Sequence, residues 1–210
     1  VAALPIKSRG QAAPTISADS ARESLVGFVR EIRVNRSLLA LTISTSVLEV
    51  LGFSHMVLLP SIVRDVLGME AEGFGLISGF RNIGGLAAIL LIVAAGDRLE
   101  KGLVYQVSIL LFGGLLIALG IAGHPAVVVA ILMGVSAMMA VTDLLSQSLI
   151  QLVVPNDLRG RAMGSWMLAI GTGPAGNLQI GAVASVAGIG VALSLNGLGL
   201  VVLAMGLLAA

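Results

Sequence analysis

Six long apolar stretches constrain this chain more than any other feature of its sequence. A helix needs roughly 20 apolar residues to cross a hydrocarbon core of about 30 Å, and each stretch is long enough to do so. The stretches cover approximately residues 37–60, 74–95, 103–123, 126–154, 162–188 and 191–210. We therefore predict an all-α, polytopic membrane protein with six transmembrane helices.

The composition agrees with lipid as the solvent. Of the 210 residues, 57% are hydrophobic and 11% are charged, whereas soluble domains are roughly a quarter charged. The net charge of +1 gives no reason to expect nucleic acid as a partner. The chain has no cysteine and only two histidines, which excludes disulfides and thiolate metal sites, and we expect no cofactor.

The residues ahead of the first apolar stretch differ from the rest. Residues 1–6 are apolar and fit the end of a preceding transmembrane helix, so we expect the chain to be a fragment. Residues 7–36 form a polar linker in which apolar residues recur on one helical face. We predict a short amphipathic helix on the membrane surface there; an ordinary helix end that continues into the first span is the alternative. Residues 37–210 are then the six-helix transmembrane bundle.

Lysine and arginine are distributed unevenly between the connecting segments. Six precede the first stretch, two lie after the second and two after the fourth, against Arg64 alone on the opposite side. Basic residues gather on the cytoplasmic side of membrane proteins. We therefore expect a multi-pass protein of the plasma (inner) membrane, with the lipid bilayer around it and both chain ends in the cytoplasm.

The loop after the second stretch reads GDRLEK. It resembles the Asp-Arg loop signature of the major facilitator superfamily in its Asp97, Arg98 and Lys101. The match is partial, because Val93 and Glu100 stand where the superfamily has glycine.

A second motif follows the fourth stretch, where the chain reads QLVVPNDLRGRAMG. It is similar to the connector between helices ten and eleven of that superfamily, especially in the drug- and siderophore-exporting branch that includes the enterobactin exporter. Asp157, Arg159 and Arg161 lie within it. In the fifth stretch, GTGPAG is similar to the Gly-Pro-rich antiporter motif of the superfamily.

The resemblance covers essentially the whole chain, and it implies a fold and an activity. The fold would be the carboxy-terminal half, helices 7–12, of a twelve-helix transporter, with the amino-terminal half of the same transporter as its partner. The activity would be proton-coupled efflux of a small amphipathic molecule or siderophore, by alternating access. Proton antiport is the expected energy source, since no nucleotide-binding motif occurs.

Each motif also has a physical interpretation. Ion pairs or helix-dipole contacts in the two loops could latch neighbouring helices in one conformation; the alternative is that the basic residues only hold the loops inside the cell. The latch residues would be Asp97, Arg98, Lys101, Asp157, Arg159 and Arg161. Proline lacks an N–H and glycine lacks a side chain, so a helix bend with close packing is expected at Gly173, Pro174 and Gly176. Direct contact of these three residues with substrate is the alternative.

Charged residues inside the apolar stretches are the candidate binding residues. Glu49, Arg81 and Asp143 are the three, and a charge at the centre of the bilayer costs at least ~2.5–3.5 kcal/mol unless it faces a partner or a cavity. Gln147 and Gln151 continue the helical face of Asp143. Our hypothesis is that Glu49 or Asp143 binds the coupling proton or a cationic substrate group and that Arg81 tunes them. The alternatives are a structural ion pair, or an Arg81 that reaches outward along its apolar stem.

Two other classes of protein fit less well. A membrane-embedded enzyme would need a nucleophile with a base, or clustered histidine and carboxylate ligands, and His55 and His124 lie without a matching acidic pair. A purely structural membrane protein would not require intramembrane carboxylates. Small-residue pairs such as Gly75 and Gly79, or Gly84 and Ala88, would permit tight helix crossing, a general feature that does not separate these classes.

Overall fold

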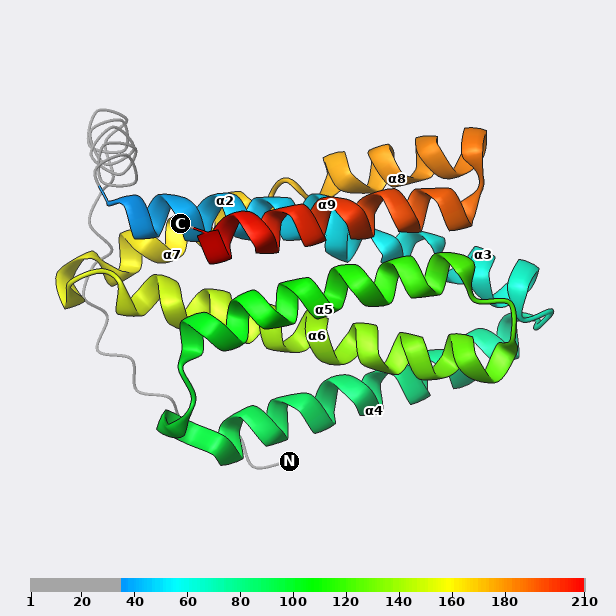
Figure 1. Cartoon of the computed structure of the whole chain (residues 1–210), viewed down its shortest axis with the longest axis horizontal. Coiled ribbons are helices and arrows are strands. Elements are labelled where there is room, and N and C mark those ends of the chain that lie inside the picture. The colour runs from blue at the N-terminus through cyan, green and yellow to red at the C-terminus, as the bar shows by residue number, and fades with distance from the viewer. Residues whose placement is uncertain (1–34, 210) are drawn as a thin grey trace, which may run out of the picture.

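The computed structural model describes residues 35–209, and this part of the chain is helical throughout apart from short connections (Figure 1). The predicted helix end at residues 1–6 lies outside the described residues. So does the predicted amphipathic helix of residues 7–36, except for the last two positions of that range. The helix bounds given below therefore begin with the first apolar stretch.

Five helical segments in the described residues are long and apolar enough to cross a membrane. They are Arg36–Val66, Glu72–Ala95, Lys101–Ile121, Pro125–Leu152 and Ile189–Ala209. The last four correspond to α4 (Ala71–Ala95), α5 (Lys101–Ile121), α6 (Pro125–Leu152) and α9 (Ile189–Ala209). The chain is a multi-pass membrane protein, and five of the six predicted spans have such a helix.

The remaining predicted span, residues 162–188, is divided into two helices. α7 (Arg159–Ile170) ends before Gly171, and α8 (Gly173–Ala187) begins two residues later with Pro174 in its first turn. Proline is tolerated in a first turn because the N–H it lacks has no helical partner there. Gly171 and Gly173, which precede this proline, therefore favour a new helix start over one continuous span.

The first span is continuous but irregular after its first three turns. α2 (Arg36–Val47) is followed by a π-helical turn, η1 (Leu48–Gly52), then by a 3-10 segment, η2 (Phe53–Leu58). A short α3 (Leu59–Ser61) and a second π turn, η3 (Ile62–Val66), complete it. Pro60 explains the end of the 3-10 segment, since it cannot donate to the carbonyl of Met56; the Leu59 N–H donates to that carbonyl instead.

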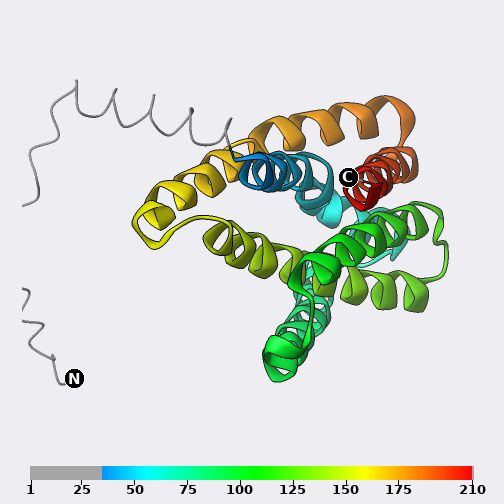
Figure 2. The same cartoon turned by 60° about the vertical axis from the view of Figure 1, so that its left-hand side comes forward.

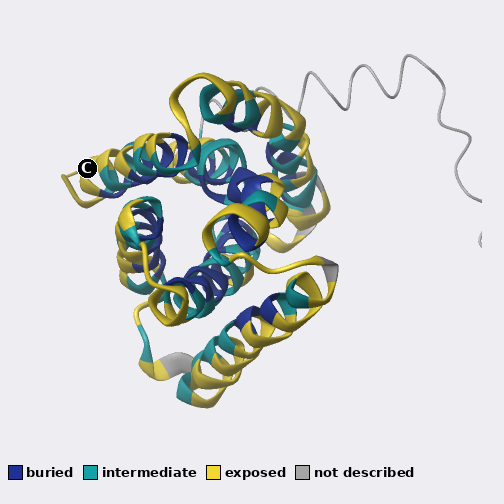
Figure 3. Cartoon of the chain, turned by 90° about the vertical axis from the view of Figure 1, so that its right-hand side faces the viewer, coloured by how far each residue is buried: buried dark blue, intermediate teal, exposed yellow. Residues whose placement is uncertain are grey.

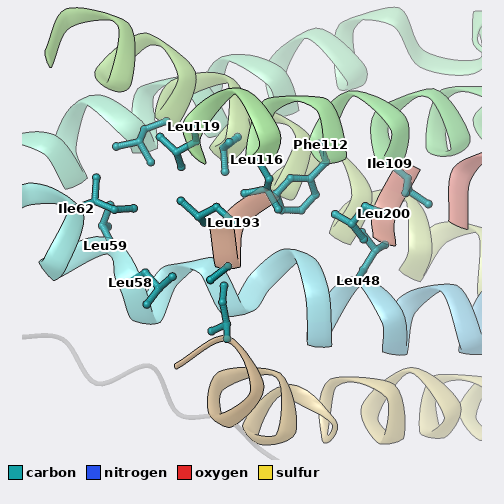
Figure 4. Packing of buried hydrophobic residues seen from close by; sticks show 14 of the residues in the cluster. Leu48, Leu58, Leu59, Ile62, Ile109, Phe112, Leu116, Leu119, Leu193 and Leu200 are labelled. Atoms are coloured by element: carbon teal, nitrogen blue, oxygen red, sulfur yellow. The ribbon is translucent and has the colours of Figure 1, made fainter. Parts of the chain in front are cut away.

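The helices pack as a bundle in which α4 stands to one side (Figure 2). The core forms between the first span, α5, α6 and α9, and its largest fully buried side chains include Leu48, Ile109, Phe112, Leu193 and Leu200 (Figure 4). Much of α4 is exposed (Figure 3), and its large exposed side chains include Leu76, Leu86 and Leu90. An apolar face without a protein neighbour suits contact with lipid or with another membrane segment.

α5 and α9 cross at unusually close range because glycines face each other. A Cβ atom on Gly197 would lie 2.5 Å from the carbonyl oxygen of Gly113, and Gly190 faces Gly120 in the same way. Gly84 packs against the backbone of Met133 on α6. The predicted pair Gly75 and Gly79 is different: both face open space among the described residues, so this pair makes no helix crossing there.

Candidate functional site

Glu49 lies in the irregular part of the first span and lines a pocket. The π-helical turn η1 carries this residue, and its side chain is partly buried. The pocket has a volume of ≈ 350 Å³, and its other lining residues are Phe53, Ser54, Met56, Val57, Gly173 and Asn177. The pocket thus combines one carboxylate with apolar walls and two small polar groups.

The start of α8 forms one wall of this pocket. A Cβ atom on Gly173 would lie 3.5 Å from Oε2 of Glu49, and one on Gly176 would lie 2.5 Å from the carbonyl oxygen of Val50. The break between α7 and α8 is held by Thr172, whose hydroxyl donates to the carbonyl of Ala169 at 2.6 Å. The Gly-Pro motif therefore brings a helix start directly against the turn that carries Glu49.

Asp143 on α6 is the second intramembrane carboxylate, and it lies within electrostatic range of Glu49. Its Oδ2 accepts a hydrogen bond from Nε2 of Gln147 at 3.2 Å. Gln151 does not extend this pair, because its Nε2 points to the sulfur of Met163 on α7 at 3.4 Å. Within the described residues, neither Glu49 nor Asp143 forms an ion pair.

Within the described residues, Arg81 forms no ion pair with Glu49 or Asp143. It is 7% exposed, and its Nε and Nη1 have no hydrogen-bond partner among residues 35–209. The charged guanidinium is instead within electrostatic range of His55. His55 is fully buried, donates from Nδ1 to the carbonyl of Gly52 at 2.6 Å, and stacks edge-on against Phe112.

The basic loops lie together at one end of the bundle. The start of α2, the α4–α5 connection, the start of α7 and the carboxyl end are all at the left of Figure 1. Arg98 and Arg159 are exposed there, and Lys101 is partly buried at the start of α5. Arg64 lies at the other end, where its Nε is 2.7 Å from the carboxylate of Asp65.

The latch itself stays a prediction. The side chains of Asp97, Asp157 and Arg161 lie outside the described part of the structure. Lys101 lines a pocket of ≈ 190 Å³ between α4, α5 and α6 together with Leu99, Leu145 and Ser148. The basic loop after α4 and the α6 helix thus line one cavity at this end.

One polar cluster lies outside the candidate binding residues predicted from the sequence. Asn196 on α9 is 1% exposed, and it joins the first span to α8 through hydrogen bonds to Leu51, Ser54 and Gln179. The sequence signal for it is an amide within a helix that is otherwise apolar or small throughout. Such an amide in lipid requires partners, but the sequence does not say which ones.

A family model described as transmembrane secretion effector matches residues 2–210. Neither curated proteins nor solved structures include a match to the chain.

Proposed function

Because the chain belongs to the transmembrane secretion effector family, a family of major-facilitator-type membrane transporters, we propose that it exports a small amphipathic molecule in exchange for protons. The family supports a transporter over an enzyme. The apolar helices and the intramembrane carboxylates fit this activity. In this proposal the 210 residues act as the carboxy-terminal half of a twelve-helix transporter, and the substrate path lies between this half and an amino-terminal half.

The observation that carries the proposal is the pair of carboxylates. Glu49 and Asp143 lie in helices long enough to cross the bilayer, within electrostatic range of each other and without an ion-pair partner among the described residues. A carboxylate in lipid is costly while it is charged, and proton binding removes that charge. A site of this kind can therefore take up a proton on one side and release it on the other as the bundle changes conformation.

The pocket beside Glu49 suits the substrate. Its volume is ≈ 350 Å³, and Phe53, Met56 and Val57 give it apolar walls around one acidic group. We propose that a cationic or hydrogen-bonding group of an amphipathic molecule docks at Glu49, so that proton and substrate compete for one carboxylate. Such competition would couple efflux to proton entry without any cofactor.

Transport driven by a proton gradient tests the proposal. Inside-out vesicles that contain the full-length transporter are expected to accumulate ethidium or enterobactin when their lumen is acidified, and an uncoupler is expected to stop the uptake. Vesicles without the transporter serve as the control. Uptake that continues in the presence of the uncoupler would contradict proton coupling. Absence of uptake of both amphipathic probes would contradict the proposed substrate class.

Sidedness is a separate prediction, and cysteine labelling measures it. The 210 residues contain no cysteine, so Glu100→Cys and His124→Cys each place a single thiol among them. Both positions are exposed, and they lie at opposite ends of the bundle. In intact cells an impermeant maleimide is expected to label His124→Cys and to leave Glu100→Cys unlabelled, because the basic loops face the cytoplasm. Permeabilised cells should label both. Labelling of Glu100→Cys from outside would reverse the proposed orientation.

A further inference from the structure

Two main-chain carbonyls in the irregular part of the first span accept hydrogen bonds from side chains. In the π turn η1 the N–H of Phe53 donates to Leu48, and the chain then tightens into the 3-10 segment η2. Such a change of helix type leaves carbonyl groups without a helical partner, and in lipid they must be satisfied by side chains. The Gly52 carbonyl accepts from His55 of the same span, at 2.6 Å. The Leu51 carbonyl accepts from another helix.

That donor is Asn196 on α9. Its Nδ2 donates to the Leu51 carbonyl at 3.0 Å and to Oγ of Ser54 at 3.2 Å. Its Oδ1 accepts from Nε2 of Gln179 on α8 at 3.1 Å. One buried amide thus connects three segments of the chain, and it uses both its donor and its acceptor groups to do so.

This cluster lies directly behind the Glu49 pocket. Ser54 belongs to both, since it bonds Asn196 and also lines the pocket. The Leu51 carbonyl belongs to the π turn that carries Glu49. Gly176 of α8 packs on Val50 within the same turn, where a Cβ atom would lie 2.6 Å from the Val50 Cα. The turn is therefore held by α8 through close packing and by α9 through hydrogen bonds.

We propose that Asn196 is a positioning residue for the transport site: its amide holds the π turn of the first span in the conformation that presents Glu49 to the pocket. The proposal rests on the transport function given above. Amides in membrane helices often only join one helix to another. Asn196 differs because its partner is a main-chain carbonyl two residues from the proposed proton-binding side chain, so the bond fixes the backbone of that turn.

A thiol placed in the pocket reports on the turn without requiring transport. In the full-length protein in membranes, Val57→Cys puts a single reactive group among these residues at an exposed pocket position. Adding Asn196→Leu, which keeps the size and removes the hydrogen bonds, is expected to change the rate of maleimide labelling about fivefold, the factor expected when one net hydrogen bond is lost. A second reporter at Val202→Cys, an exposed position on α9, is expected to keep its rate.

Gln106→Leu is the matched control. Gln106 also donates from a side-chain amide to a main-chain carbonyl of α9, that of Leu207, at 3.0 Å, but it does not contact the first span through this bond. It is expected to leave the Val57→Cys rate unchanged. If Asn196→Leu leaves the rate unchanged as well, or if Gln106→Leu changes it equally, the positioning role is refuted.

A conservative variant and a smaller one complete the test. Asn196→His retains a donor and is expected to bring the labelling rate back towards that of the parent. If Asn196→Leu does not assemble in the membrane, Asn196→Ser decides, because its shorter side chain stays polar but cannot reach the Leu51 carbonyl as the amide does; an unchanged rate then refutes the proposal. Altered labelling in a protein that shows no proton-driven uptake would support the role of Asn196 in holding the turn and would reject the transport proposal. Failure of the positioning role and failure of the transport function are therefore distinguishable.

Discussion

Neutralising Glu49 by Glu49→Gln is expected to reduce proton-driven export to the level of vesicles without the transporter. The amide keeps the size of the side chain and can neither bind nor release a proton. Asp143→Asn is expected to act in the same direction, because Asp143 lies within electrostatic range of Glu49 and shares its lack of an ion-pair partner among the described residues. The measurement is probe uptake into inside-out vesicles under an imposed proton gradient.

Glu72→Gln is the control for this prediction. Glu72 is an exposed carboxylate in the first turn of α4, so its neutralisation changes the net charge equally without touching the pocket. It is expected to export at the parental rate. The amount of each variant in the membrane must match the parent, so that a loss reflects transport. Normal export by both Glu49→Gln and Asp143→Asn would refute the hypothesis that these carboxylates bind the coupling proton.

Gly197→Val is expected to have the largest effect on stability. A Cβ atom at this position would lie 2.5 Å from the Gly113 carbonyl oxygen and 2.8 Å from the Ile117 side chain. Since the nearest atom belongs to a backbone, α5 and α9 would have to move apart. Overpacking of this kind costs about 1–3 kcal/mol. Heating the full-length protein in detergent and measuring the fraction that stays monodisperse should show a clearly lowered midpoint.

Gly114→Val is the matched control for this packing prediction. Gly114 adjoins Gly113 on α5, and a Cβ atom there meets nothing within 4 Å. The same substitution therefore adds the same apolar volume on the outer side of the same helix. We expect its midpoint to stay close to that of the parent. Equal losses from Gly197→Val and Gly114→Val would show that the α5–α9 crossing is not what controls stability, since Gly→Val does not lower helix propensity.

The membrane class of this protein followed from the sequence because hydropathy is summed along the chain. A helix long enough to cross lipid can be predicted from the hydropathy of its own residues, without knowledge of the helices that surround it. The five helices of the structure coincide with five of the predicted stretches to within several residues. The exception is residues 162–188, where Gly171 and Thr172 separate α7 from α8; the sequence predicted a bend in this region.

The composition of the candidate site could be predicted only in part. Glu49, Asp143 and Arg81 were identifiable because charge is rare in these helices. Their grouping was not: Arg81 is within electrostatic range of His55 and forms no ion pair with the carboxylates among the described residues. The sequence placed Gln151 on the helical face of Asp143 but could not give its partner, which is the sulfur of Met163 on α7.

Helix rotation and crossing explain what the sequence left open. A regular period assigns each residue to a face, but the π and 3-10 turns after Val47 change the rotation of everything that follows in the first span. Which glycines face a neighbour likewise depends on where two helices cross, so Gly113 and Gly197 meet whereas Gly75 and Gly79 face open space. The sequence by itself thus determined that the chain enters lipid, where its helices run and which charges lie within them. Only the tertiary structure decided which of these groups meet, because a contact depends on the rotation and crossing of two helices, and neither is a property of one segment alone.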